Sequence, residues 1–237
     1  MRKALLASAF CAVISLTGCT KANNVSSSDS VSQPTDNLDQ TIADDSASEN
    51  AITTCRSGKP VAGRPLKVVT TVSPITSIAG VLSAGTDIQV TGVIPEGSNS
   101  HTFEPPPSAA KTLAEADLIF VNGLNLDDPL KSLAEANKKP SAVICEVGTA
   151  AVPKSEWVFD FSFPEDAGNP NPHAWTDPPY VLRYINYIRD AMTAMAPATI
   201  PVVDSNYVKL SGVVTGLDQA MKTATDTVPV RNRKLLT

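Results

Sequence analysis

Short apolar runs alternate with amphipathic segments along the chain from residue 67 onward. Runs rich in Val, Ile and Leu, of the kind buried inside a parallel sheet, lie at residues 67–72, 87–94, 118–122 and 142–147. Pro, Gly and Asn punctuate the joins. Helix-like segments lie between the runs, at residues 77–84, 108–116 and 127–137. Strand and helix in alternation predict an α/β fold with a four-stranded parallel sheet flanked by helices.

Two longer amphipathic segments follow the predicted sheet. In the first, Asp177 suits the cap of a helix and Pro178 its first position. The buried stripe of this helix consists of Val181, Tyr184 or Ile185, Ile188, Met192 and Met195. Residues 204–226 carry apolar side chains at the same spacing, over about 35 Å of helix axis. We therefore expect two consecutive long helices after the sheet.

The amino-terminal residues have the pattern of a secretory leader. Arg2 and Lys3 precede an apolar stretch at residues 4–16, which is shorter than the ~20 residues that span a bilayer. This predicts a signal peptide at residues 1–18. The sequence LTGC at residues 16–19 resembles the bacterial lipobox, which implies that Cys19 carries acyl chains that hold the protein on a membrane. An ordinary signal peptide with a chance Gly-Cys at its end is the alternative.

A polar segment follows the leader. Residues 20–54 contain seven serines, six acidic residues, one lysine and no aromatic residue. Such a composition buries too little apolar surface to offset the entropy of ordering. We therefore expect residues 19–60 to form a lipid-anchored flexible tether.

Charge and cysteine content narrow the classes of function. The chain has 19 basic and 24 acidic residues and no dense Lys/Arg cluster, which argues against a nucleic-acid partner. Of its four cysteines, Cys11 lies in the leader and Cys19 is the predicted anchor. A disulfide between Cys55 and Cys145 is chemically permitted outside the cytoplasm, but the sequence leaves that pairing open.

The chain has two histidines, and both lie in proline-flanked loops where a parallel sheet presents its ligand-binding edge. His101 follows the second predicted strand, and His173 directly precedes a predicted helix. Proline restricts the backbone around each ring, which lowers the entropic cost of holding an imidazole for a metal ion. A lone histidine in a loop is more often an ordinary surface residue, so both readings stay open on these grounds.

Three ordered segments resemble a known family. HTFEPPPS at residues 101–108 and PHAWTDP at residues 172–178 resemble the two amino-terminal ligand loops of the zinc and manganese solute-binding proteins of ABC importers (cluster A-I type). NGLNL at residues 122–126 resembles a third landmark, which packs beneath the site. The resemblance implies that His101 and His173 ligate one divalent metal ion, Zn²⁺ or Mn²⁺, as transported ligand, with no organic cofactor.

The resemblance also implies a division of the chain. It places an amino-terminal metal-binding lobe at residues 61–200, an interlobe connecting helix at 201–230 and the start of a truncated second lobe at 231–237. Since this family carries its third and fourth ligands on the second lobe, we expect half of a metal site here. Asn171 stands where the family commonly has Asp, and Phe103 where Tyr is common, so we expect a supporting carboxylate or hydroxyl to be missing.

The implied function is capture of zinc or manganese outside the cytoplasm and delivery to an ABC permease. By resemblance the protein is a monomer, lipid-anchored to the outer face of a bacterial membrane. The alternatives are a surface adhesin or other partner-binding lipoprotein, and a non-functional fragment with half a site. Residues 150–169 lack histidine, which favours manganese or a zinc receptor without a His-rich loop.

Catalysis is not expected. The chain contains no His-x-x-x-His pair, no Gly-x-Ser-x-Gly elbow and no Gly-rich phosphate loop with Lys. His101 and Glu104 lie in a proline-rich loop, which offers no helical face to align a metal ligand with a general base.

Overall fold

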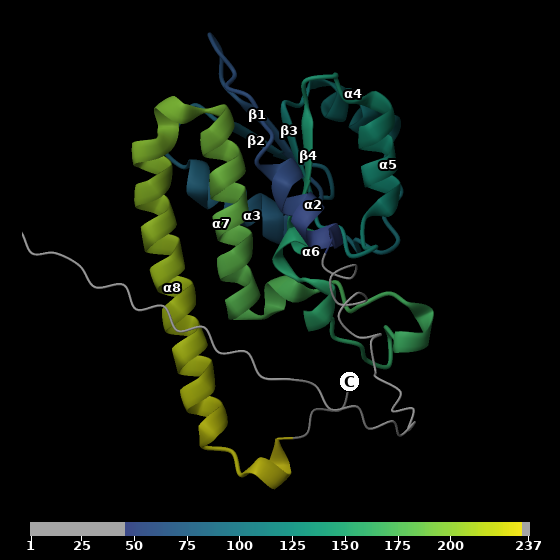
Figure 1. Ribbon diagram of the computed structural model, residues 1–237, viewed down its shortest axis with the longest axis vertical. Coiled ribbons are helices and arrows are strands. Elements are labelled where there is room, and N and C mark those ends of the chain that lie inside the picture. Colours follow the sequence, from purple (N-terminus) through teal and green to yellow (C-terminus); the bar gives the residue numbers. More distant parts are fainter. Residues whose placement is uncertain (1–45, 234–237) are drawn as a thin grey trace, which may run out of the picture. The chain divides into compact units, whose positions relative to one another are not determined.

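The protein is described by a computed structural model that covers residues 46–233. One sheet has the strand order β2-β1-β3-β4 with every neighbouring pair parallel, which confirms the predicted fold class (Figure 1). Its strands are β1 (Lys67–Thr70), β2 (Gln89–Gly92), β3 (Leu118–Val121) and β4 (Val143–Glu146). They are shorter than predicted because apolar residues such as Val72 and Ile94 are buried in the connections and not paired in the ladder.

One face of the sheet is covered by α4 (Pro107–Glu115) and α5 (Asp128–Asn137) (Figure 1). Side chains alternate between the two faces along each strand, and Val69, Ile119 and Val121 point into this smaller core. Leu113 of α4 and Ala134 of α5 are fully buried against them. The two helices thus begin and end within a residue of the predicted segments.

The opposite face holds the larger core and several helices. These are α3 (Ser73–Ser83), the short α6 (Val147–Ala151), α7 (Pro178–Met195) and, outside α3 and α7, the 27-residue α8 (Ile200–Asp226). α7 and α8 lie side by side, joined by the short 3₁₀ turn Pro197–Thr199 (Figure 1). α8 begins four residues before the predicted helix, and its second half leaves Val213, Leu217 and Met221 exposed.

The helix α2 (Ser46–Cys55) lies where a flexible tether was predicted at residues 19–60, so this part of the prediction is wrong. The composition of a 35-residue window hid a ten-residue helix at its end. Ala51 and Cys55, four positions apart on one helical face, are buried against β4, α6 and α7. The folded unit therefore starts before residue 61. Residues 19–45 of the predicted tether lie outside the described part of the chain.

The cysteine pairing that the sequence left open is present in the structure. Cys55, the last residue of α2, forms a disulfide with Cys145 in β4, and the two Cα atoms are 4.6 Å apart. Both residues are at most 1% exposed. The bond joins positions 90 residues apart in the sequence and fixes α2 to the sheet.

Other predictions for the two ends of the chain cannot be compared with the structure. The signal peptide at 1–18 and the anchor Cys19 lie outside the described residues. Residues 234–237 of the second-lobe start predicted at 231–237 also lie outside them. Within residues 46–233, no helix is both long enough and apolar enough to cross a bilayer.

A buried carboxylate organises the edge of the sheet opposite the histidine loops. Asp117, 3% exposed, directly precedes β3 and binds the Arg64 guanidinium through both oxygens at 2.6 and 2.7 Å. It also contacts Lys139 Nζ at 2.6 Å and accepts the backbone N–H of Lys67 at 3.0 Å. Burial alone would raise the pKa of Asp117, but these donors outweigh it and hold that pKa well below its usual range.

We expect the Asp117 cluster to add a pH-dependent part to stability. A carboxylate whose folded pKa lies below its unfolded value of about 4 stabilises the fold above that value, and the contribution is lost as pH falls toward the folded pKa. Urea unfolding at pH values from 7 to 3 should show this loss below about pH 4. Asp117→Asn should lose about 2 kcal/mol at pH 7 and flatten the profile. An unchanged profile in the variant would refute this role.

Candidate metal centre

The two histidines meet beyond the carboxyl ends of the strands. His101 lies in the β2–α4 connection, and His173 lies between α6 and the 3₁₀ helix Ala174–Thr176 that leads into α7. Their Nε2 atoms are 3.0 Å apart, although 72 positions separate them in sequence. The ring centroids are 5.1 Å apart at an interplanar angle of 60°. The fold thus brings together the two residues that sequence selected as metal ligands.

This geometry suits a shared cation. With metal–nitrogen distances of about 2.0–2.1 Å, two nitrogens 3.0 Å apart subtend an angle of about 90° at the metal. In the metal-free protein one ring must carry a proton between the two Nε2 atoms. The Nδ1–H of His173 donates to Asn171 Oδ1 at 2.7 Å, which leaves His173 Nε2 as the acceptor and His101 as the donor. A bound cation would replace that proton.

Burial and the neighbouring ring favour the neutral form of His173, which is the form that binds a metal. Desolvation is the main cause that lowers the pKa of His173, and the nearby ring of His101 lowers that pKa further. The carboxylate of Asp160 acts in the opposite direction. Neutral imidazole is therefore favoured at this position.

Asn171, which stands where a supporting carboxylate was expected to be missing, contacts His173 and is itself hydrogen-bonded to a carboxylate from earlier in the chain. Asn171 Oδ1 accepts both the ring Nδ1–H and the backbone N–H of His173, at 2.7 and 3.0 Å. Its amide nitrogen donates to Asp160 Oδ2 at 2.6 Å. The direct partner of His173 is thus an amide, as expected, and the sequence could not show that the Asp160 carboxylate lies behind it.

Aromatic side chains surround the imidazole pair. The ring of Phe163 lies 5.9 Å from that of His101 and 5.7 Å from that of His173. Trp175 packs edge-on against His173 at 5.2 Å. Trp157 instead packs edge-on against Phe159, with ring centroids 6.3 Å apart. Phe163 is thus an apolar neighbour of both imidazole rings. No pattern in the sequence pointed to this residue.

A buried polar network holds the His173 loop from beneath. Tyr184 of α7 donates to Asn122 Oδ1 at 2.7 Å, and Asn122 Nδ2 donates to the carbonyl of Pro172 at 3.2 Å. Asp127 accepts the backbone N–H groups of Asn122 and Gly123 at 2.8 and 2.9 Å, and burial raises its pKa. The 122–126 landmark thus supports the loop without ligating. The Asn-Gly turn was visible in the sequence, but its partners were not.

Gly123 explains why this turn tolerates no larger residue. Its φ is +74°, in the left-handed region that favours glycine. A Cβ atom there would also lie only 2.9 Å from the carboxylate of Glu146 and still closer to Thr149 Oγ1. The turn at Gly123 places Asn122 beneath the His173 loop, where its amide contacts the carbonyl of Pro172.

In the described part of the chain, the histidine pair has no third candidate ligand beside it. Within residues 46–233, no group of three or more His, Cys, Asp or Glu side chains could hold a metal ion. A hollow of about 200 Å³ lies beside His173, lined in part by Asn171, Asp177 and Tyr180. Asp177 precedes α7 as predicted, but its side chain makes no capping hydrogen bond.

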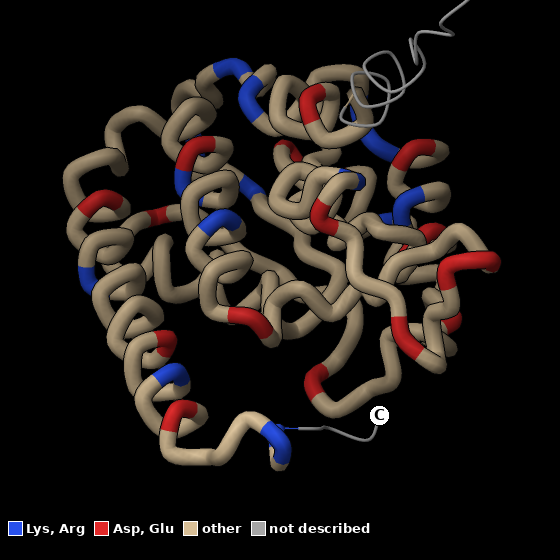
Figure 2. Tube along the Cα trace, turned by 60° about the horizontal axis from the view of Figure 1, so that its bottom comes forward, with Lys and Arg blue, Asp and Glu red and all other residues tan. Residues whose placement is uncertain are grey.

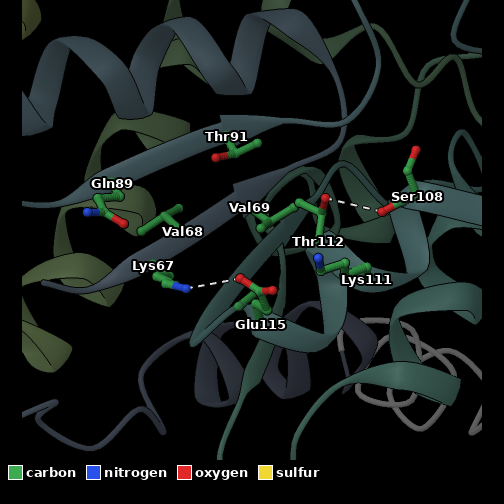
Figure 3. A pocket seen from close by; sticks show the side chains of 10 residues that line it. Lys67, Val68, Val69, Gln89, Thr91, Ser108, Lys111, Thr112 and Glu115 are labelled. Carbon is green, nitrogen blue, oxygen red and sulfur yellow. Dashed lines mark hydrogen bonds and ion pairs between the residues drawn. The ribbon is translucent and has the colours of Figure 1, made fainter. Parts of the chain in front are cut away.

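A larger hollow, of about 440 Å³, lies elsewhere, where α4 crosses β1 and β2 (Figure 3). Figure 3 shows Lys67 paired with Glu115 at its edge, at 3.0 Å, and the hydroxyl of Thr112 donating to the Ser108 carbonyl. Neither histidine lines it. Its lining combines the Lys67–Glu115 ion pair with apolar residues such as Val69, so the histidine pair is the better candidate site.

Comparison with known proteins places this geometry in a family. The family model described as "ZnuA: Zinc-uptake complex component A periplasmic" matches residues 68–237. The chain is 27% identical over 174 residues to the "Manganese-binding lipoprotein MntA" of Halalkalibacterium halodurans, covering 73% of this chain and 54% of that protein. It is 29% identical to the "Manganese ABC transporter substrate-binding lipoprotein PsaA" of Streptococcus anginosus, covering 79% and 61%.

A solved structure shows the same architecture. The Mn-bound periplasmic metal binding protein from Candidatus Liberibacter asiaticus matches with a TM-score of 0.62 and 26% identity, over 71% of this chain and 60% of that one. The chain therefore spans little more than half the length of the relatives that it matches. The family match covers well over half of the chain, and the chain belongs to the ZnuA family of periplasmic zinc-uptake complex components.

Proposed function

We propose that the chain is the amino-terminal, metal-capturing lobe of a solute-binding protein that serves an ABC importer of zinc or manganese. One observation carries this proposal: two imidazoles from separate loops approach to 3.0 Å between their Nε2 atoms at the ligand-binding edge of the sheet. The relatives named above for manganese binding support it.

In this proposal His101 and His173 each give Nε2 to one divalent cation, which is cargo and not a catalytic cofactor. Two ligands leave other coordination positions open, while a closed protein site for zinc has four ligands. We propose that ligands outside the described residues complete the site. By the family resemblance they lie on a second lobe, and the relatives' chains are longer than this one. Alone, the two histidines should bind metal weakly.

We further propose that the mature protein is a monomer, anchored outside the cytoplasm by acylated Cys19, and that it delivers its cation to a membrane permease. The relatives from H. halodurans and S. anginosus are named as lipoproteins, and the second as an ABC transporter component. In the view of Figure 2, basic and acidic positions are interspersed along the described part of the chain. The adhesin alternative has no observation among these residues in its favour.

Titration of the purified chain with ZnCl₂ or MnCl₂ tests the proposal. Metal at 100 times its dissociation constant should stabilise the fold by about 2.7 kcal/mol and raise Tm by about 5–10 °C. The measurement is a thermal melt with parallel calorimetric titration. Mg²⁺, which prefers oxygen ligands, serves as the control and should have no such effect. Equal indifference to all three cations at millimolar concentration would contradict metal capture and favour an adhesin lobe.

A further inference from the structure

A line of three side chains connects His173 to the loop before it. The ring Nδ1–H of His173 donates to Asn171 Oδ1, and Asn171 Nδ2 donates to Asp160 Oδ2 at 2.6 Å. An amide has one accepting and one donating end, so Asn171 can orient His173 only if something fixes which end faces the ring. The Asp160 carboxylate only accepts, so it selects the orientation in which the amide oxygen faces His173, in the same sense as the His173 backbone N–H that donates to that oxygen at 3.0 Å.

The same carboxylate also builds the turn that places Phe163. Asp160 Oδ1 accepts the backbone N–H groups of Ser162 and Phe163, at 2.8 and 3.1 Å. Asp160 and Phe163 also exchange backbone hydrogen bonds at 3.0 and 3.2 Å. The aromatic ring held by this turn lies within 6 Å of both imidazole centroids. Asp160 thus contacts Asn171, which supports His173, and also forms the turn that holds Phe163.

We propose that Asp160 is a positioning residue for the metal site: through Asn171 it fixes the Nδ1–H tautomer of His173, and through its turn it seats Phe163 beside both rings. The accepting Nε2 of His173 then faces the site before any metal arrives. Supports of this kind behind a ligating histidine change metal affinity by about 10- to 100-fold. The inference rests on the proposed function, because positioning His173 matters only if this residue binds a metal. The tautomer of His173 can nevertheless be measured without metal.

The test is the tautomer of His173 in the metal-free protein, read by ¹H–¹⁵N correlation of the imidazole nitrogens. The chain has two histidines, so the spectrum of His101→Ala assigns each ring. In the wild-type chain Nδ1 of His173 should carry the proton. In Asp160→Ala only the backbone N–H of His173 still orients the Asn171 amide, and the ring should become a mixture of tautomers. Zinc affinity should fall about 10-fold.

Two further variants separate positioning from general loosening of the loop. Asp166→Ala removes the same charge from an exposed position in the same loop and should leave the tautomer unchanged. Asn171→Asp in the Asp160→Ala background places an acceptor-only side chain beside His173, which needs no orienting partner. This double variant should restore the Nδ1–H tautomer, whereas Asn171→Asp alone would set two carboxylates against each other and weaken binding.

Every outcome bears on the inference. If Asp160→Ala keeps the Nδ1–H tautomer, or if Asn171→Asp fails to restore it, Asp160 does not position His173. Should the Ala variant lose its melting transition, Asp160→Asn replaces it. Its amide would present a donor to Asn171, so the tautomer should shift toward Nε2–H. Loss of the proposed function would appear differently, as wild-type metal binding that survives removal of either histidine.

Discussion

His101→Ala and, separately, His173→Ala should each abolish the binding of zinc and manganese that we expect of the isolated chain. The reason is the small ligand number: among residues 46–233 no third side chain joins the pair, so one imidazole would hold the cation by a single bond. The measurement is calorimetric titration of each variant, with metal retained after desalting determined by elemental analysis.

A matched control for the histidine variants comes from the same loop. Glu96→Gln alters an exposed residue of the β2–α4 connection and should leave metal binding unchanged. The folds of all variants should stay intact, because His101 is exposed and the polar network under His173 does not include its ring. Metal binding that is undiminished in either histidine variant would refute the assignment of the site.

Removal of the disulfide should have the largest effect on stability. The bond closes a loop between positions 90 residues apart, for which the chain-entropy model gives about 4–5 kcal/mol, and measured losses for native disulfides are about 2–5 kcal/mol. The double variant Cys55→Ala, Cys145→Ala should therefore lower the free energy of unfolding by about 4 kcal/mol and Tm by about 10 °C. Alanine avoids placing an unpaired hydroxyl in this fully buried position.

Urea unfolding of the wild type and the double variant, each with and without reductant, checks the predicted contribution of the disulfide. Reductant should bring the wild-type chain to the stability of the double variant and should leave the variant itself unaffected. Hydrogen exchange should show the greatest loss of protection in α2, because Cys55 ends that helix and its remaining buried contacts are few. Equal stability of wild type and variant under oxidising conditions would contradict the predicted contribution.

The sheet and the histidine pair could be predicted because both depend on regular signals. Buried parallel strands read as continuous apolar runs, and the loops at their carboxyl ends converge at one edge. These signals placed His101 and His173 at the same edge, and the family resemblance implied their shared role as metal ligands. Asp127 and Tyr184 could not be placed beneath them, because a buried acid or hydroxyl gives no periodic signal of its partner.

The sequence failed where a short segment depends on distant contacts. α2 has few apolar residues, and Ala51 and Cys55 become buried only because β4, α6 and the partner Cys145 receive them. Asp160 lies in an irregular loop, eleven positions before Asn171, and composition alone makes it another solvated acid. The roles of α2 and Asp160 therefore depend on tertiary contacts, which no local sequence pattern predicts.

The cystine between α2 and β4 also determines how the lobe responds to mechanical load. Tension on the chain ahead of Ser46 passes along α2 and crosses the covalent bridge into the sheet. The backbone of residues 56–66, between α2 and β1, is a longer covalent connection parallel to this one. Since neither histidine loop lies on this route, pulling at that end should reorient the whole lobe without separating the imidazoles.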